Sequence, residues 1–116
     1  MNDQNQISIV IIGYNTCNQL STLLKSINNQ KLDNQLIEII YIDDGSSDKS
    51  FQMFNDFITP YKKISKKFQN NRGRVEATQA GITLASGKWL FFVRSNEFLN
   101  PNTLREYSLA IESNLG

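Results

Sequence analysis

Short apolar runs that alternate with helix-like segments constrain the fold of this chain more than any other feature. "ISIVIIG" (7–13), "LIEIIYI" (36–42) and "WLFFV" (89–93) are almost wholly apolar and rich in β-branched or aromatic residues. Apolar runs of this length are typical of strands that are buried on both faces, as in a parallel sheet. A weaker strand is expected at "KKISKKFQ" (62–69), where Ile64 and Phe68 fall on one face.

Each expected strand is followed by a helical pattern. After the first strand, apolar residues recur at spacings of three and four, which places them on one helix face. The segment 73–87 has small residues at its inward positions, so this helix is predicted to lie close to the sheet. Asn100 and Pro101 are typical of the N-cap and first residue of a last helix. The expected inward faces are Leu20, Leu23, Leu24 and Ile27; Phe51, Phe54 and Ile58; Ala77, Ala80, Gly81 and Ala85; and Leu104, Tyr107 and Ile111.

This alternation predicts one α/β domain over residues 1–116, with residues 1–6 outside its ordered part. The expected architecture is a three-layer α/β/α Rossmann-like sandwich with a mostly parallel sheet in the strand order 3-2-1-4. In such sheets ligands bind beyond the carboxyl ends of the strands. Three strand ends are polar, and we expect them to converge: Gly13-Tyr14-Asn15, Asp43-Asp44-Gly45-Ser46 and Arg94-Ser95-Asn96-Glu97.

The composition excludes several kinds of chemistry and partner. The chain has no histidine, so neither Ser-His-Asp nor Cys-His catalysis is available to it. Its single cysteine fits a reducing compartment, and we expect a cytoplasmic location, free or at the membrane face. A net charge of +1 argues against a nucleic-acid partner, and the basic segment 62–74 is interpreted as a solvated face. No apolar run approaches the ~18 residues of a transmembrane segment.

The polar strand ends leave two interpretations open. Carboxylate, amide and hydroxyl oxygens are ligands for Mg²⁺ or Mn²⁺ and hydrogen-bonding groups for a polar molecule. The same residues also suit strand-to-helix turns, in which Asn15 or one of the aspartates 43–44 caps the next helix. The spacing alone does not separate the two.

The strand ends, together with "NRGRVEATQAG" (71–81), resemble the nucleotide-sugar-binding half of family 2 glycosyltransferases, which have the GT-A fold. "SIVIIGYN" (8–15) is similar to the first strand of that family, with Ile12 where proline is usual. "EIIYIDDGSSD" (38–48) is similar to its most recognisable segment, and Gln79 stands where asparagine is usual. The nucleotide-binding residues that the resemblance implies are Tyr14, Asn15, Asp43, Asp44, Gly45, Ser46, Arg72, Gly73 and Arg94. Arg72 and Arg74 are further candidates for contacts with phosphate.

The last strand end departs from the family pattern. Family members have Asp-x-Asp-Asp where this chain has Arg94, Ser95, Asn96 and Glu97. The resemblance implies a Mg²⁺ or Mn²⁺ ion at this position, and here only Asn96 and Glu97 remain as weak ligands. Three outcomes stay open: a weakened metal site, direct contact between Arg94 and a diphosphate, or loss of catalysis.

The resemblance implies transfer of a sugar, with inversion, from a UDP- or GDP-linked donor to an acceptor that the sequence does not identify, as in polysaccharide biosynthesis. The chain is expected to be a shortened, donor-binding domain without a general base, so little or no transfer is expected and enzymatic activity stays open. The alternatives are a non-catalytic nucleotide- or sugar-binding module and a protein-interaction module. Self-association through the exposed core of a shortened sheet is a further expectation.

Overall fold

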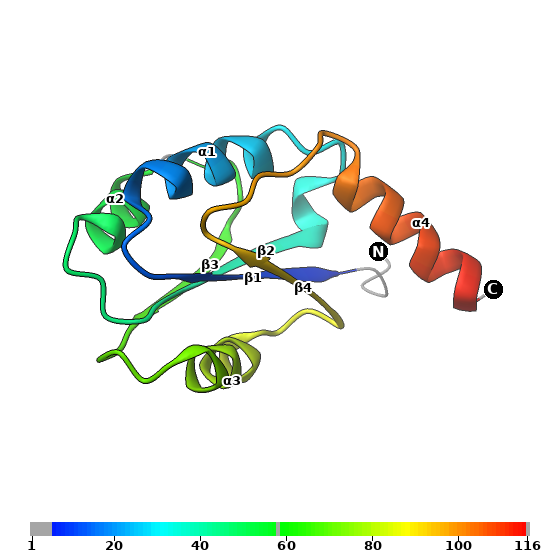
Figure 1. Ribbon diagram of the computed structural model, residues 1–116. Coiled ribbons are helices and arrows are strands. Elements are labelled where there is room, and N and C mark those ends of the chain that lie inside the picture. Colours follow the sequence, from blue (N-terminus) through cyan, green and yellow to red (C-terminus); the bar gives the residue numbers. More distant parts are fainter. Residues whose placement is uncertain (1–5, 58, 116) are drawn as a thin grey trace.

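The computed structural model describes residues 6–57 and 59–115 (Figure 1). Its four strands form one parallel sheet in the order β3-β2-β1-β4, which confirms the expected order. The strands are β1 (Ile7–Gly13), β2 (Ile37–Asp43), β3 (Lys63–Phe68) and β4 (Trp89–Arg94). Of the residues 1–6 expected to lie outside the ordered domain, 1–5 fall outside the described part. Gln6 is described, and its carbonyl accepts a hydrogen bond from the Trp89 N–H.

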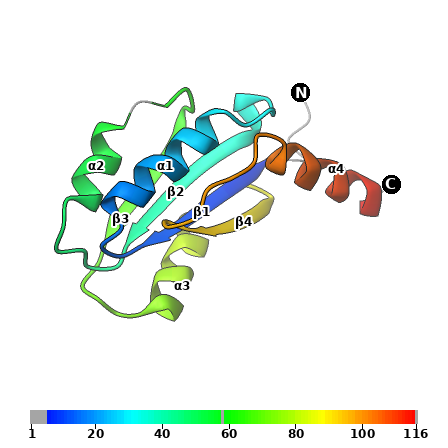
Figure 2. The same cartoon turned by 45° about the horizontal axis from the view of Figure 1, so that its top comes forward.

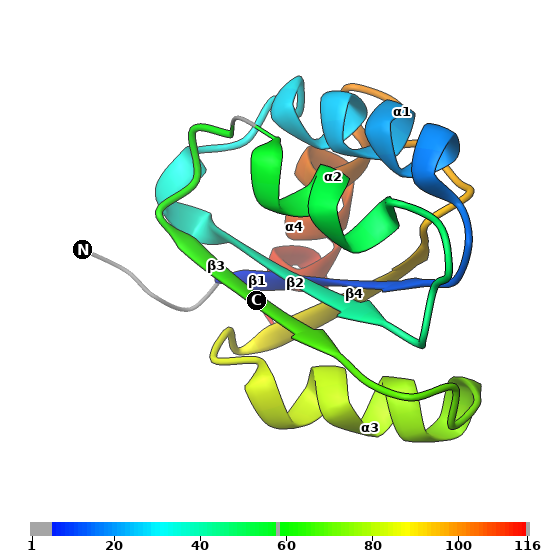
Figure 3. The same ribbon diagram turned by 90° about the vertical axis from the view of Figure 1, so that its left-hand side faces the viewer.

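Helices cover both faces of the sheet, as expected for three layers. The helices are α1 (Cys17–Asn28), the 3₁₀ helix η1 (Asn34–Leu36), α2 (Ser50–Asp56), α3 (Arg74–Leu84) and α4 (Thr103–Leu115). Figures 2 and 3 show α1 and α2 on one face and α3 on the opposite face. Within the described ranges, no helix has the length and apolar character needed to cross a bilayer.

The strands of the sheet have two apolar faces because successive side chains point in opposite directions. In β1, Ile7, Ile9 and Ile11 pack in one core with the apolar side chains of α1. Val10 belongs to a smaller core on the other face, together with Ala77 of α3. The isoleucine-rich runs therefore form strands without a solvent-exposed face, because helices cover both faces of β1 and β2.

Helix α3 lies close to the sheet, as its small residues predict. Ala77 is fully buried. A Cβ atom added at Gly81 would lie 2.4 Å from Cγ1 of the buried Val10. This contact leaves no room for a side chain at Gly81.

The expectation that the run 89–93 is buried on both faces is wrong for one face. Phe92 is 48% exposed. β4 is an edge strand, and α3 packs over β1 and β2 instead. The face of β4 on the α3 side is therefore only partly covered.

Two helix boundaries also differ from the sequence prediction. The last helix begins at Thr103, and residues 101–102 form a turn before it. Asn100 Oδ1 accepts the Asn102 N–H, as a capping side chain does. α2 ends at Asp56, and Ile58, expected on its inward face, lies outside the described residues. The expected inward residues Leu104 and Ile111 of α4 are buried.

Candidate functional site

A cavity of about 490 Å³ lies where the carboxyl ends of β1 and β4 meet the start of α3. Two of the three polar strand ends thus converge, and Asp44 reaches the cavity from the third. The lining includes five of the predicted site residues: Tyr14, Asp44, Arg94, Asn96 and Glu97. The rest of the lining is Ile12, Gly13, Thr16, Arg74, Thr78, Phe92, Val93 and Ser95.

Asp43 and Asp44 face opposite sides of the sheet. Asp43 is fully buried on the side of α2, outside the cavity lining. Its Oδ2 accepts a hydrogen bond of 2.7 Å from the Tyr41 hydroxyl, and its Oδ1 accepts one of 2.7 Å from the Ser46 N–H. Asp43 therefore holds the turn between β2 and α2.

Asp44 lies on the α3 side and lines the cavity, although only 7% of its surface is exposed. Its Oδ1 accepts hydrogen bonds from Gln69 Nε2 at 3.0 Å and from the Arg72 N–H at 2.9 Å. Its Oδ2 accepts one from the Gly73 N–H at 3.0 Å. Burial alone would raise the pKa of Asp44, but these three hydrogen bonds hold it below its ordinary value, so the carboxylate is charged at neutral pH.

Gly45 and Gly73 allow the loop before α3 to approach Asp44. Gly45 has φ +87°, and a Cβ there would lie 2.7 Å from the Asn71 backbone nitrogen. Gly73 has φ +94° at the N-cap of α3. Both predicted residues therefore shape the backbone around the carboxylate and do not line the cavity.

Asn15 and Ser46 join the loops that follow β1 and β2. The Asn15 N–H donates to Ser46 Oγ at 2.9 Å, and Asn15 Oδ1 accepts from the N–H groups of Ser47 at 2.8 Å and Asp48 at 3.2 Å. Asn15 has φ 52°, a left-handed conformation that asparagine tolerates better than most residues. Neither Asn15 nor Ser46 lines the cavity.

The residues after β4 form a tight turn. The Arg94 N–H donates to Glu97 Oε1 at 2.7 Å, and the Glu97 N–H donates to the Arg94 carbonyl at 3.0 Å. Ser95 is buried, and its hydroxyl is hydrogen-bonded to the Thr16 hydroxyl. The side chains of Arg94, Asn96 and Glu97 remain exposed at the cavity. Within the described ranges, no three or more His, Cys, Asp or Glu side chains cluster as metal ligands.

The sequence prediction of the site lacks several lining residues, among them Thr16, Thr78 and Phe92. Thr78 follows Arg74 by four residues, which places both on one face of α3. That spacing is the signal that could have identified Thr78. Phe92 lines the cavity because β4 is an edge strand, which no local pattern indicates.

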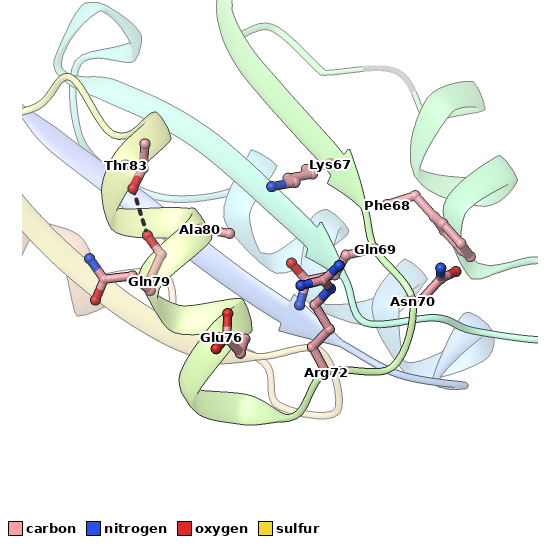
Figure 4. A pocket seen from close by; sticks show the side chains of 9 residues that line it. All are labelled: Lys67, Phe68, Gln69, Asn70, Arg72, Glu76, Gln79, Ala80 and Thr83. Carbon is pink, nitrogen blue, oxygen red and sulfur yellow. Dashed lines mark hydrogen bonds between the residues drawn. The ribbon is translucent and has the colours of Figure 1, made fainter.

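Arg72 lies at a neighbouring cavity of about 530 Å³ between β3 and α3. Figure 4 shows its side chain near Gln69 and Asn70, with Glu76 and Gln79 projecting from α3. The two arginines singled out as phosphate contacts are thus separated, and only Arg74 lines the first cavity.

Comparison with known proteins links these features to one family. The model of "Glycosyl transferase family 2" matches residues 8–114. The putative glycosyltransferase EpsH of Bacillus subtilis is 34% identical over 100 residues, which cover 83% of this chain and 27% of the relative.

Solved structures support the fold. Staphylococcus aureus TarS (residues 1–349) in complex with UDP-GlcNAc superposes with a TM-score of 0.85 at 22% identity, over 93% of this chain and 31% of TarS. The mannosyltransferase PcManGT from Pyrobaculum calidifontis, in complex with GDP-Man and Mn²⁺, gives a TM-score of 0.82 at 16% identity, over 92% of this chain and 31% of that structure. The chain thus spans about a third or less of these proteins.

Proposed function

This chain belongs to glycosyl transferase family 2, and on that premise we propose that its 490 Å³ cavity binds the nucleotide part of a nucleotide-sugar donor. The observation that carries the proposal is the position of Asp44. Its charged carboxylate lines a cavity at the carboxyl ends of a parallel sheet with the GT-A strand arrangement.

Asp44 and Tyr14 are proposed to hold the nucleoside. Asp44 Oδ2 accepts one hydrogen bond from the protein, and a carboxylate oxygen can accept a second from a base N–H or a ribose hydroxyl. Tyr14 is 49% exposed and lines the same cavity, so its ring is available to stack on a base. Asp43, Asn15, Gly45, Ser46 and Gly73 are proposed to act indirectly, by holding the loops around Asp44.

UDP and GDP are the appropriate probes. TarS is described in complex with UDP-GlcNAc, and PcManGT in complex with GDP-Man. These ligands belong to those proteins, but both contain a nucleoside diphosphate. We propose the same class of donor for this chain.

Sugar transfer itself is proposed for a longer enzyme. Both carboxylates of the cavity have other tasks, because Asp44 is proposed to hold the nucleoside and Glu97 closes the turn after β4 by accepting the Arg94 N–H. We therefore assign neither of them the role of general base. We therefore propose that the 116-residue chain binds the donor without transferring the sugar. This also keeps a non-catalytic binding module as the second candidate.

Isothermal titration of the chain with UDP and with GDP tests the proposal. Asp44→Asn and Tyr14→Ala should each weaken binding by about tenfold, because one removes a charged acceptor and the other a stacking surface. Asp56→Asn is the matched control, since Asp56 lies at the exposed end of α2 outside the cavity.

Thermal melts of each variant separate a loss of binding from a loss of folding. Tyr14→Ala is informative even if Asp44→Asn unfolds, because Tyr14 is largely exposed. If neither nucleotide binds to the folded chain, the proposal is wrong and a protein-interaction module becomes the better interpretation.

A further inference from the structure

The oxygen ligands at the end of β4 do not fit a divalent cation. Mg²⁺ and Mn²⁺ prefer anionic oxygens. Here Arg94 places a positive charge at the cavity, Asn96 offers only a neutral amide, and Glu97 Oε1 already accepts the Arg94 N–H at 2.7 Å. The cavity's other carboxylate, Asp44, is held by three hydrogen bonds.

A carboxylate of the chain itself already lies at the start of α3. Backbone N–H groups at a helix N-terminus often bind phosphate. In this chain the N–H groups of Arg72 and Gly73 donate to Asp44, which is itself the anion at this helix end. Because this carboxylate would repel a phosphate at the helix start, cationic side chains are the better candidates to balance a diphosphate.

Two arginines provide that charge from different elements. Arg74 lines the cavity from α3, and Arg94 lines it from the end of β4. Among the described residues, neither guanidinium group has a side-chain ion pair. A guanidinium can donate two parallel hydrogen bonds to phosphate oxygens and remains charged at any physiological pH.

We propose that Arg74 and Arg94 bind the diphosphate of the donor directly, so that nucleotide binding by this chain requires no divalent cation. This inference rests on the proposed function and adds how the same cavity neutralises its ligand. Thr78, one helical turn from Arg74, is placed to donate a further hydrogen bond from its hydroxyl.

The first test is titration of the 116-residue chain with UDP and GDP in buffer containing Mn²⁺ and in buffer containing EDTA. The expected result is the same affinity in both buffers. The affinity should fall as salt is added, because salt screens the attraction between the exposed arginines and the diphosphate. Binding that disappears in EDTA and returns with Mn²⁺ would overturn the inference and leave the proposed function intact.

The second test removes each arginine. Arg74→Ala and Arg94→Ala should each weaken UDP binding in EDTA by about tenfold and UMP binding less, since UMP lacks the second phosphate. Arg105→Ala is the matched control, because Arg105 is an exposed arginine of α4 outside the cavity. Wild-type affinity in both cavity variants would refute the role of the arginines.

A reversal variant tests the same idea from the other side. Arg94→Asp combined with Asn96→Asp replaces the cation and the amide with two carboxylates. UDP binding by this double variant should become dependent on Mn²⁺. Tight, EDTA-resistant binding by the variant would contradict the inference, whereas failure of the wild-type chain to bind any nucleotide would refute the proposed function first.

Discussion

Neighbouring residues at the candidate site have different tasks because the chain turns as each strand ends. Asp43 points toward α2 and is satisfied by Tyr41 and Ser46, whereas Asp44 points toward α3 and reaches the cavity. The same division applies after β1, where Tyr14 lines the cavity and Asn15 holds the neighbouring loop. At each strand end, a proposed binding residue thus lies beside a residue that supports its loop.

Asn15 allows a test of this supporting role. Asn15→Ala should lower the free energy of unfolding by about 2 kcal/mol, because alanine disfavours φ 52° and lacks the Oδ1 acceptor. Asn15→Gly should lower it by about 1 kcal/mol, since glycine accepts the backbone conformation but also loses the acceptor. Urea unfolding measures both, with the exposed Asn70→Ala as control. Equal stability of all three variants would argue against the assigned role.

At the scale of elements, α3 positions the site by its distance from the sheet. Its alanines and glycine allow it to approach β1 and β2, and this brings Arg74 and Thr78 to the cavity. The loop before it is fixed by Asp44, which accepts hydrogen bonds from the N–H groups of Arg72 and Gly73. The packing of the sheet and the shape of the proposed binding cavity therefore depend on the same helix.

Gly81→Ala tests that packing. Alanine is the better helix former by about 1 kcal/mol, but its Cβ would overlap Val10 Cγ1. We expect the clash to dominate and to destabilise the protein by about 1–3 kcal/mol. The double variant with Val10→Ala should show a favourable coupling energy, because the smaller residue removes the overlap. Additive effects in this double-mutant cycle would contradict the close contact.

For the whole molecule, buried carboxylates connect segments that are distant in the sequence. Glu38 of β2 accepts hydrogen bonds from Ser8 of β1 and from the N–H and hydroxyl of Ser86 before β4. Burial would raise the pKa of Glu38, but these hydrogen bonds hold it below its ordinary 4.5. Asp48 is exposed, and its pKa is also lowered: partial desolvation would raise it, but hydrogen bonds from Ser50 and the Cys17 N–H lower it more.

These lowered pKa values predict an acid-labile fold. A carboxyl group with a lower pKa in the folded state stabilises the protein above its unfolded pKa, and this contribution is lost as the pH falls through the folded value. We therefore expect the free energy of unfolding to be constant from pH 7 to about 5 and to fall below about pH 4. Urea unfolding over this range checks the prediction, and Glu38→Gln should flatten the curve. Unchanged stability at pH 3 would contradict it.

The unpaired edge of β4, with Phe92 half exposed, is consistent with the expected self-association, which stays a prediction.

The sequence predicts the fold class, the parallel sheet, its strand order and the inward face of each described helix. These features depend on apolar periodicity and β-α alternation, which are visible in consecutive residues. The meeting of the polar strand ends at one cavity follows too, since parallel strands bring their carboxyl ends to one edge. That this cavity binds a ligand stays a prediction.

Only the tertiary structure decided which of these residues line the cavity. Arg72 and Arg74 are two positions apart, yet the loop and helix start place them at different cavities. The sequence predicts Phe92 as a core residue, but it lies on an edge strand that α3 does not cover. The sequence by itself determined the elements and their order, because those depend on local periodicity. The exposure of a side chain depends on which distant element packs over it, and that is settled only when the whole chain is folded.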